Sequence, residues 1–102
     1  MKQVMVRYKV NPDRAQENEE LVRAVYEELR RTRPEGLRYA TFRLDDEVSF
    51  VHLASIETED GHNPLSEVRA FGRFQENIGD RCDEAPAATA LSQVGSFRLF
   101  DG

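Results

Sequence analysis

The sequence predicts an α+β fold of the ferredoxin-like type, in which strand, helix, strand, strand, helix and strand build a four-stranded antiparallel sheet. Apolar and polar residues alternate with the period of a strand over residues 2–10, 37–44 and 48–56, and apolar residues recur at helical spacing over 21–29. An Asn-Pro pair, at 11–12 and again at 63–64, precedes each of the two predicted helices. A chain of 102 residues has room for one such domain, spanning residues 1–102.

The first half of the chain predicts a strand and a long helix. From Lys2 to Val10 the side chains alternate with the period of a strand. Asn11-Pro12-Asp13 ends this strand, and either Asn11 or Asp13 is the expected helix N-cap. The apolar stripe of the helix consists of Leu21, Val22, Val25 and Leu29. Pro34 and Gly36 follow its last turn and end it.

The middle of the chain predicts a β-hairpin whose second strand, Val48 to Ile56, is central in the sheet. The turn residues are Asp45 and Asp46. A two-residue turn, or a four-residue turn with the same pairing, places Tyr39 opposite His52 as cross-strand neighbours. A three-residue turn would pair opposite faces of the two strands, which the apolar pattern disfavours.

The second half predicts a helix, a connector and a last strand. The helix begins at Asn63-Pro64 and ends at Gly79. Its apolar stripe consists of Leu65, Val68, Phe71, Phe74 and Ile78. Residues from Asp80 to Gln93 have no clear period and are predicted to form a connector. Val94 to Phe100 is the predicted last strand.

The two faces of the predicted sheet differ in composition. Because two helices cover one face, the more apolar side of each strand is assigned to the helices. That side carries Val4, Val6, Val10, Ala40, Phe42, Leu44, Val51, Leu53, Phe97 and Leu99. The other side carries Met5, Arg7, Lys9, Leu37, Tyr39, Thr41, Arg43, Phe50, His52, Ala54, Ser96 and Arg98. This mixed face is too apolar to lie in water, so a partner is expected to cover it.

Two segments carry a resemblance to a known family. They are the strand end Tyr8-Lys9-Val10-Asn11-Pro12 and the helix start Gly61-His62-Asn63-Pro64-Leu65, whose helix carries Phe71 and Phe74. With the order of elements, these segments resemble the dimeric α+β barrel proteins, especially the antibiotic-biosynthesis-monooxygenase-like group. The resemblance implies a homodimer in which two sheets pack face to face, with a small-molecule cavity beside the sheet in each protomer.

Members of that group include cofactor-independent oxygenases of polycyclic aromatic molecules, haem-degrading enzymes and quinol oxygenases. This chain has no tryptophan, Arg7 stands where haem-degrading members have an asparagine, and His62 is placed roughly like their haem-ligating histidine. The resemblance therefore implies fold and dimerisation and leaves two functions open. One is a cofactor-independent monooxygenase-like enzyme acting on an aromatic or quinone-type molecule. The other is a non-catalytic dimer that binds a small molecule or a protein.

His52 and Tyr39 are the candidate catalytic residues, because imidazole acts as a base near neutral pH and a phenol can donate a hydrogen bond to an enolate. The alternative is a structural histidine bonded to a neighbouring tyrosine. The candidates for ligand binding are Arg7, Phe50, His62, Phe74 and Arg98. Arginines would bind an anionic ligand in a planar fork, although arginines at strand ends also pair across a dimer or reach water.

Composition disfavours several classes of protein. A net charge of −5 argues against a nucleic-acid partner, and no run approaches the ~20 apolar residues of a membrane span. The start of the chain leads into a strand rather than a signal peptide, so a cytoplasmic location is expected. The lone Cys82 excludes an internal disulfide and a thiolate cluster for zinc. No phosphate-binding glycine loop occurs, and neither a cofactor nor a metal is expected.

Overall fold

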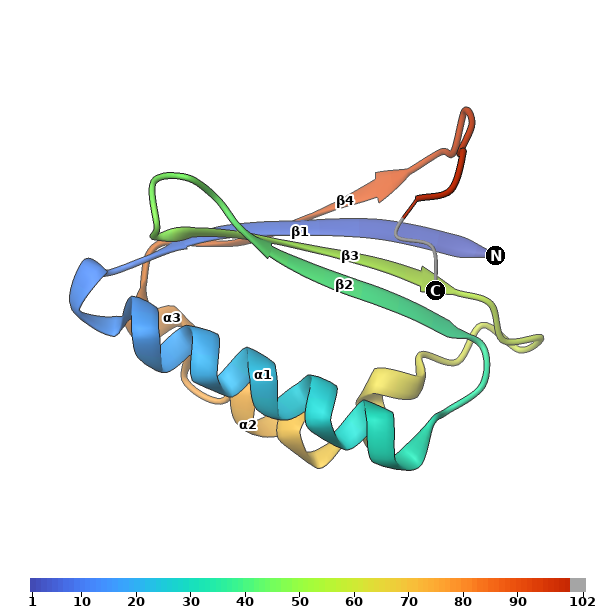
Figure 1. The fold of residues 1–102 in the computed structure, drawn as a ribbon, viewed down its shortest axis with the longest axis horizontal. Helices are drawn as coiled ribbons and strands as arrows, with labels where there is room; N and C mark the ends of the chain where they lie inside the picture. Colours follow the sequence, from blue (N-terminus) through green and yellow to red (C-terminus); the bar gives the residue numbers. More distant parts are fainter. Residues whose placement is uncertain (100–102) are drawn as a thin grey trace.

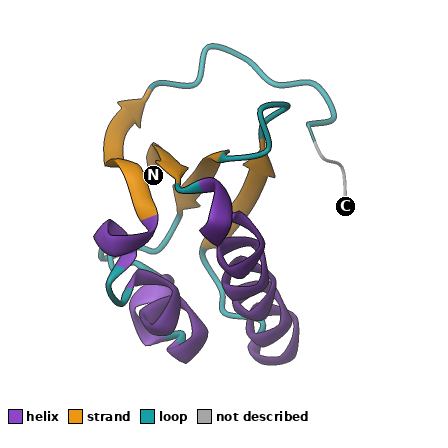
Figure 2. Cartoon of the chain, turned by 90° about the vertical axis from the view of Figure 1, so that its left-hand side faces the viewer, coloured by secondary structure: helices purple, strands orange, loops and turns teal. Residues whose placement is uncertain are grey.

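The computed structural model describes residues 1–99 and has the predicted α+β architecture (Figure 1). One layer is a sheet, and the helices cover one of its faces (Figure 2). The strands are β1 (Lys2–Val10), β2 (Leu37–Arg43), β3 (Ser49–Ile56) and β4 (Cys82–Leu91). The helices are α1 (Ala15–Thr32), α2 (Arg69–Gln75) and α3 (Ile78–Arg81), with 3-10 turns at Pro12–Arg14 and Pro64–Glu67. The sheet order is β2-β3-β1-β4, and all neighbouring strands are antiparallel.

Asn11, one of the two predicted N-caps, starts the first helical segment. Its side chain accepts a hydrogen bond from the backbone N–H of Asp13 at 3.0 Å, which satisfies one of the free donors at a helix start. The 3-10 turn passes directly into α1, whose inner face buries Val22 and Val25. The helix ends where Arg33 adopts a left-handed conformation with φ 46°. Both ends of this long helix are therefore fixed beneath the sheet (Figure 1).

The predicted register of the hairpin is wrong by two residues. Thr41, rather than Tyr39, lies opposite His52. The cause is a wider loop, in which the Asp46 carboxylate accepts hydrogen bonds from both the backbone N–H and the hydroxyl of Ser49. Strand β3 consequently begins only at Ser49. Because the shift is an even number of residues, Tyr39 and His52 still share a face of the sheet.

The predicted assignment of faces is right for β1 and inverted for β2 and β3. Val6 lies opposite His52 and Tyr8 lies opposite Phe50, and residues directly opposite each other share a face. His52 and Phe50 therefore face the helices, with 5% and 2% of their surface exposed, and Tyr39 packs beside them. Aromatic rings bury more apolar area than the largely aliphatic side chains of the other face, which favours this arrangement.

The second helical region is broken, contrary to the prediction of one continuous helix. After a 3-10 turn, α2 ends at Gln75, Asn77 follows with φ 55°, and the short α3 contains Gly79 rather than ending before it. The residues predicted as a connector form β4, which pairs with β1. The sheet is thus completed by a segment whose sequence lacks a clear period.

The segment beyond β4 also differs from the prediction. Residues 94–99 of the predicted last strand contain no strand, and Phe100 lies outside the described residues. Phe97 and Leu99, predicted to lie in the core, are 83% and 61% exposed. Figure 1 shows this segment on the side of the sheet away from the helices. Within residues 1–99, no helix has the length and apolar character needed to span a membrane.

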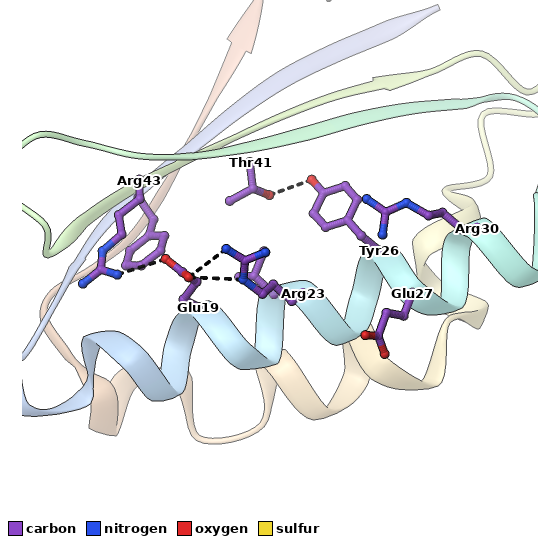
Figure 3. A pocket seen from close by; sticks show the side chains of 9 residues that line it. Glu19, Arg23, Tyr26, Glu27, Arg30, Thr41 and Arg43 are labelled. Atoms are coloured by element: carbon purple, nitrogen blue, oxygen red, sulfur yellow. Dashed lines mark hydrogen bonds and ion pairs between the residues drawn. The ribbon is translucent and has the colours of Figure 1, made fainter. Parts of the chain in front are cut away.

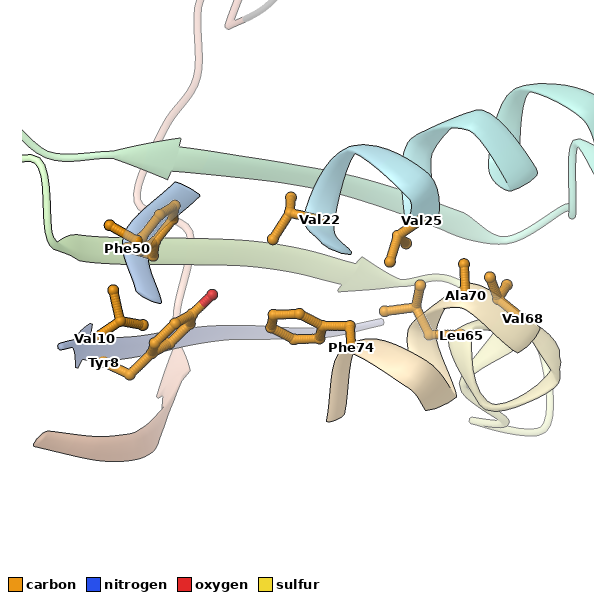
Figure 4. Packing of buried hydrophobic residues seen from close by; sticks show 10 residues of the cluster. Tyr8, Val10, Val22, Val25, Phe50, Leu65, Val68, Ala70 and Phe74 are labelled. Carbon is orange, nitrogen blue, oxygen red and sulfur yellow. The ribbon is translucent and has the colours of Figure 1, made fainter. Parts of the chain in front are cut away.

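The core lies between the sheet and the helices (Figure 4). Its buried members are Tyr8, Val10, Ala15, Val22, Val25, Phe50, Leu65, Val68, Ala70 and Phe74. The rings of Tyr8 and Phe50 stack with centroids 5.6 Å apart. Glu28 of α1 accepts hydrogen bonds from the backbone N–H groups of Arg69 and Ala70, at 3.0 and 2.9 Å, at the start of α2. This carboxylate joins the two main helices over the sheet.

The sheet face away from the helices is partly apolar. Met5 lies there as predicted, directly opposite Leu53, and both side chains are half buried. Phe50 and Ala54, which the sequence placed beside Met5, lie on the helix side instead, because Ala54 is opposite Tyr39 on β2. The apolar character of this outer face therefore comes from Met5 of β1 and Val51 and Leu53 of β3, together with Ala40 and Phe42 of β2, which lie opposite Leu53 and Val51.

Phe74→Ala and Phe71→Ala are expected to differ in their effect on stability. Phe74 is 5% exposed and its ring centroid lies 5.2 Å from that of His52, whereas Phe71 is half buried. Loss of the Phe74 ring leaves a cavity in the core, so Phe74→Ala should lower the free energy of unfolding by about 3 kcal/mol or more. Urea denaturation should show a clearly smaller loss for Phe71→Ala, and equal losses would contradict this description of the core.

Candidate functional site

A chain of buried hydrogen bonds runs between the sheet and the helices. Arg81 of α3 donates from Nε to Asn18 Oδ1 of α1 at 3.3 Å. Asn18 Nδ2 donates to the Tyr8 hydroxyl at 2.8 Å, and that hydroxyl lies 2.8 Å from His52 Nε2. None of these four side chains is more than 5% exposed. The chain therefore links α3, α1, β1 and β3 through the interior.

From His52 the chain continues to the edge strand β2. His52 Nδ1 lies 2.6 Å from the Tyr39 hydroxyl and 3.1 Å from the Thr41 hydroxyl. Tyr26 reaches up from α1, and its hydroxyl lies 2.7 Å from that of Thr41 (Figure 3). The rings of Tyr26 and Tyr39 stack with centroids 5.4 Å apart. Among residues 1–99, no buried side-chain nitrogen or oxygen lacks a hydrogen-bond partner, so this polar interior is satisfied.

Burial controls the protonation of these groups. Desolvation penalises the charged form, which lowers the pKa of His52 to about 4 and raises the pKa of Tyr26 to about 12. Desolvation also raises the pKa values of Tyr8 and Tyr39 well above the ordinary value for a phenol. At neutral pH the imidazole is therefore uncharged, and the three tyrosine hydroxyls keep their protons.

Two hollows open between α1 and β2, and both reach Tyr26. The smaller, of about 370 Å³, is lined by Glu19, Val22, Arg23, Tyr26, Glu27, Arg30, Thr41, Arg43 and Phe50 (Figure 3). The larger, of about 520 Å³, is lined by Tyr26, Leu29, Arg30, Arg33, Pro34, Glu35, Leu37 and Tyr39. Their volumes fall in the range of small-molecule sites. Hydroxyl groups of the buried chain thus form part of the walls of a cleft of ligand size.

Charged side chains form the outer wall of the smaller hollow. Glu19 makes ion pairs with Arg43 at 2.9 Å and with Arg23 at 3.0 Å, and their hydrogen bonds hold the pKa of its carboxyl below the ordinary value. Arg30 makes no ion pair with any of residues 1–99, and its side chain extends from α1 beside Tyr26 (Figure 3). Arg30 is therefore a cation that a ligand in either hollow can meet.

Four of the sequence-predicted candidates are brought together. Tyr39 and His52 are bonded to each other, although they are diagonal rather than direct neighbours across the hairpin. Phe50 lines the smaller hollow, and the Arg43 guanidinium lies 5.7 Å from its ring centroid. Phe74 packs against His52 from the helix side. The predicted catalytic pair and two of the predicted ligand-binding residues therefore form one cluster.

The other three candidates lie away from the two hollows. Arg7 is exposed on the outer face of the sheet, because alternation in β1 places its neighbour Tyr8 under the helices. His62 lies in the loop before the second 3-10 turn, where its Nε2 is 3.1 Å from Glu67. Arg98 lies in the exposed segment beyond β4.

Five residues of the network are absent from the sequence-based candidates: Tyr8, Asn18, Tyr26, Thr41 and Arg81. Asn18 did carry a signal, because a polar residue four before Val22 and seven before Val25 lies on the apolar stripe of the helix. Tyr8 also alternates with the apolar residues of β1. The sequence offers no comparable signal for Arg81, whose contacts arise from the break between α2 and α3.

Comparison with known proteins supports the fold. No protein-family model matches the chain, and no curated protein matches it by sequence. Solved structures do match. A provisionally assigned antibiotic biosynthesis monooxygenase from Nitrosomonas europaea aligns with a TM-score of 0.75 and 17% identity, over 93% of this chain and 100% of that chain. Rv0793 from Mycobacterium tuberculosis aligns with a TM-score of 0.62 and 20% identity, over 93% and 96%.

A mutant of SnoaB, a cofactor-independent oxygenase from Streptomyces nogalater, aligns with a TM-score of 0.63 and 15% identity, over 96% of this chain and 97% of that one. These likenesses cover nearly the full length of each chain. The protein therefore has the fold of the antibiotic-biosynthesis-monooxygenase-like α+β proteins, which confirms the fold that the sequence resemblance implied.

The depressed pKa of His52 predicts a loss of stability at mildly acidic pH. The unfolded chain binds a proton near pH 6.5, whereas the folded chain does so only near pH 4. Stability should therefore be complete above pH 6.5 and fall by up to roughly 3 kcal/mol as the pH drops to 4.

Urea denaturation at several pH values measures this effect. His52→Gln keeps an amide donor and acceptor but does not titrate, so it should remove this part of the pH dependence. The contribution of Asp46 lies in a separate window, because hydrogen bonds from Ser49 lower its pKa from 3.8 to about 2. A wild-type stability that is flat from pH 6.5 to 4 would contradict the burial of a neutral imidazole.

Proposed function

We propose that this protein binds an oxygen-substituted aromatic or quinone-type molecule in the cleft between α1 and β2 and oxidises it with dioxygen, without a bound cofactor. The proposal rests on one observation: the uncharged side chains of Tyr8, His52 and Tyr39 are hydrogen-bonded to one another behind a cleft of ligand size. The fold also supports it, because a cofactor-independent oxygenase shares that fold.

In such a reaction the ligand supplies the electrons, one atom of dioxygen enters the ligand, and the other leaves as water. The protein has to hold the ligand, exclude water and stabilise the negative charge that develops on a ligand oxygen. The hydroxyls of Tyr26 and Tyr39 line the larger hollow, where one of them can donate a hydrogen bond to that oxygen, and Arg30 favours its negative charge. The stacked rings of the two tyrosines also offer an apolar wall to an aromatic ligand.

His52 has a different role in this proposal from the one that the sequence suggested. Both of its ring nitrogens are occupied by protein hydroxyls, and only 5% of its surface is exposed. It therefore acts through Tyr39 and Thr41, whose hydroxyls it orients, rather than as a base that touches the ligand.

Oxygen consumption tests the enzyme. With a panel of hydroquinones and polyphenols, the wild-type protein should consume dioxygen faster than the buffer does. Tyr39→Phe should lower that rate by about 10-fold or more, the effect expected when one donor to a developing oxyanion is lost. A second variant, Thr41→Val, removes a hydroxyl bonded to both His52 and Tyr26 and should also lower the rate.

The matched control is Thr32→Val, which removes an exposed hydroxyl of α1 that donates to the backbone carbonyl of Glu28 and lines neither hollow, so it should leave the rate unchanged. Retained folding of each variant is checked by circular dichroism and thermal unfolding. If no substrate of the panel is oxidised faster than in buffer, or if Tyr39→Phe keeps the full rate, the proposed enzyme is wrong.

A non-catalytic binding protein is the second candidate function. It is favoured by the paired charges of the smaller hollow, where Glu19 is already engaged by Arg23 and Arg43. Such a protein would raise its melting temperature with an aromatic ligand and would show no oxygen consumption. The same panel of compounds therefore separates the two functions.

We also propose that the protein is a homodimer joined through the outer face of the sheet. Met5, Val51 and Leu53 make part of that face apolar, and all three are half buried in the single chain. The exposed Val94, Phe97 and Leu99 follow β4 on the same side of the sheet. A second copy would cover this combined apolar surface, which is unfavourable in water.

Leu53→Lys is expected to convert the dimer to a monomer, because it places a charge in the centre of the proposed interface. Sedimentation velocity at micromolar concentration measures the assembly. The control variant is Glu20→Lys, which changes the charge at an exposed position of α1 on the helix side of the molecule and should leave the dimer intact. A wild-type protein that sediments as a monomer would overturn the proposed assembly.

A further inference from the structure

The direction of the buried hydrogen-bond chain is set at its inner end by Arg81. A guanidinium carries only donors, so the Asn18 atom that faces Arg81 Nε must be the oxygen. The amide nitrogen of Asn18 therefore faces Tyr8 and donates to its hydroxyl. Arg81 is itself held by the carbonyls of Phe74 at 2.5 Å and Glu76 at 3.2 Å, and it is only 2% exposed.

The next link follows from the single hydrogen of a phenol. The Tyr8 oxygen accepts from Asn18, and the other polar partner of that hydroxyl is His52 Nε2. Tyr8 must therefore donate to Nε2, which leaves the imidazole proton on Nδ1. The reverse tautomer would direct two donors at the Tyr8 oxygen and leave the phenol hydrogen without an acceptor in the interior.

At the outer end of the buried hydrogen-bond chain, beside the cleft, there are more polar hydrogens than hydrogen bonds that can use them. His52 Nδ1–H and the hydroxyls of Tyr39, Thr41 and Tyr26 supply four hydrogens. The contacts among them are those of His52 with Tyr39 or Thr41, of Tyr39 with Thr41, and of Thr41 with Tyr26. Because these contacts use three hydrogens at most, one hydroxyl hydrogen is left to be donated into the cleft.

We infer that Arg81 is a positioning residue that acts through Asn18 and orients the buried hydrogen-bond chain so that its hydrogens point toward the cleft. The site therefore donates a hydrogen bond to a ligand oxygen and selects a phenolate or enolate. Arg30 adds a positive charge without an ion pair to any of residues 1–99 at the same place, which favours an oxyanion over a neutral carbonyl. The choice of ligand rests on the proposed function, whereas the direction of the chain does not.

Nitrogen-15 NMR of histidine-labelled protein at pH 7 reports the direction without any ligand. Wild-type His52 should be the Nδ1–H tautomer. Asn18→Asp is nearly isosteric but presents a carboxylate oxygen to Tyr8, so Tyr8 should donate to residue 18 and the imidazole should change to the Nε2–H tautomer. Arg81→Lys keeps a donor beside Asn18 and should preserve the wild-type tautomer. A wild-type Nε2–H tautomer, or no change in Asn18→Asp, would overturn the proposed direction.

Binding of two probes then tests the ligand class. Isothermal titration should show that wild-type protein binds 2-hydroxy-1,4-naphthoquinone, an anion at neutral pH, about 10-fold or more tightly than neutral 1,4-naphthoquinone, because hydrogen bonds to charged groups are the stronger ones. Asn18→Asp should lose most of this preference. Equal or tighter binding of the neutral quinone would contradict the proposed preference for an oxyanion. If neither probe binds, the proposed function and the ligand class both fail, while the tautomer still decides the direction.

Discussion

The buried imidazole of His52 is the constraint on which the rest of the structure depends. Removing its two polar atoms from water is costly unless both are bonded, and Tyr8 occupies Nε2 while Tyr39 and Thr41 occupy Nδ1. These partners stand on the two strands that flank β3. Satisfying one side chain therefore selects the register of β3 against both neighbours. A slip of one residue would turn His52 to the outer face and leave those hydroxyls without it.

The sequence predicted the elements of the first two-thirds better than their faces. Period and caps alone located β1, α1, β2 and β3, because local propensity and tertiary packing agree there. The face assignment failed because it ranked the strand sides by aliphatic content and treated His52 as a polar residue that should avoid the core. A histidine with bonded nitrogens packs like an aromatic residue, and here it lies against Phe74 and Tyr8.

The last third was harder to predict because its strand has weak propensity. In β4, Ala85 and Pro86 lie opposite the single residue Tyr8, between the pairs Arg7 with Ala87 and Lys9 with Glu84. Such a bulge on an edge strand tolerates a residue that lacks an N–H, so the proline does not exclude a strand there. The more apolar segment after it resembles a strand in composition, yet residues 94–99 form none in the single chain. Pairing with β1, rather than the local sequence pattern, determines which residues of this region form the last strand.

The candidate site was half predictable for a related reason. Tyr39 and His52 stand on strands of clear period, so an even register error still left them on one face. The remaining members depend on where α1 and α3 lie over the sheet, which core packing and the Glu28 link to α2 determine. Since β2 is an edge strand, no further strand of residues 1–99 covers the gap where Tyr26 reaches across from α1. The proposed ligand would meet neutral hydroxyls there, and the inferred direction of the buried chain would set their orientation from the interior.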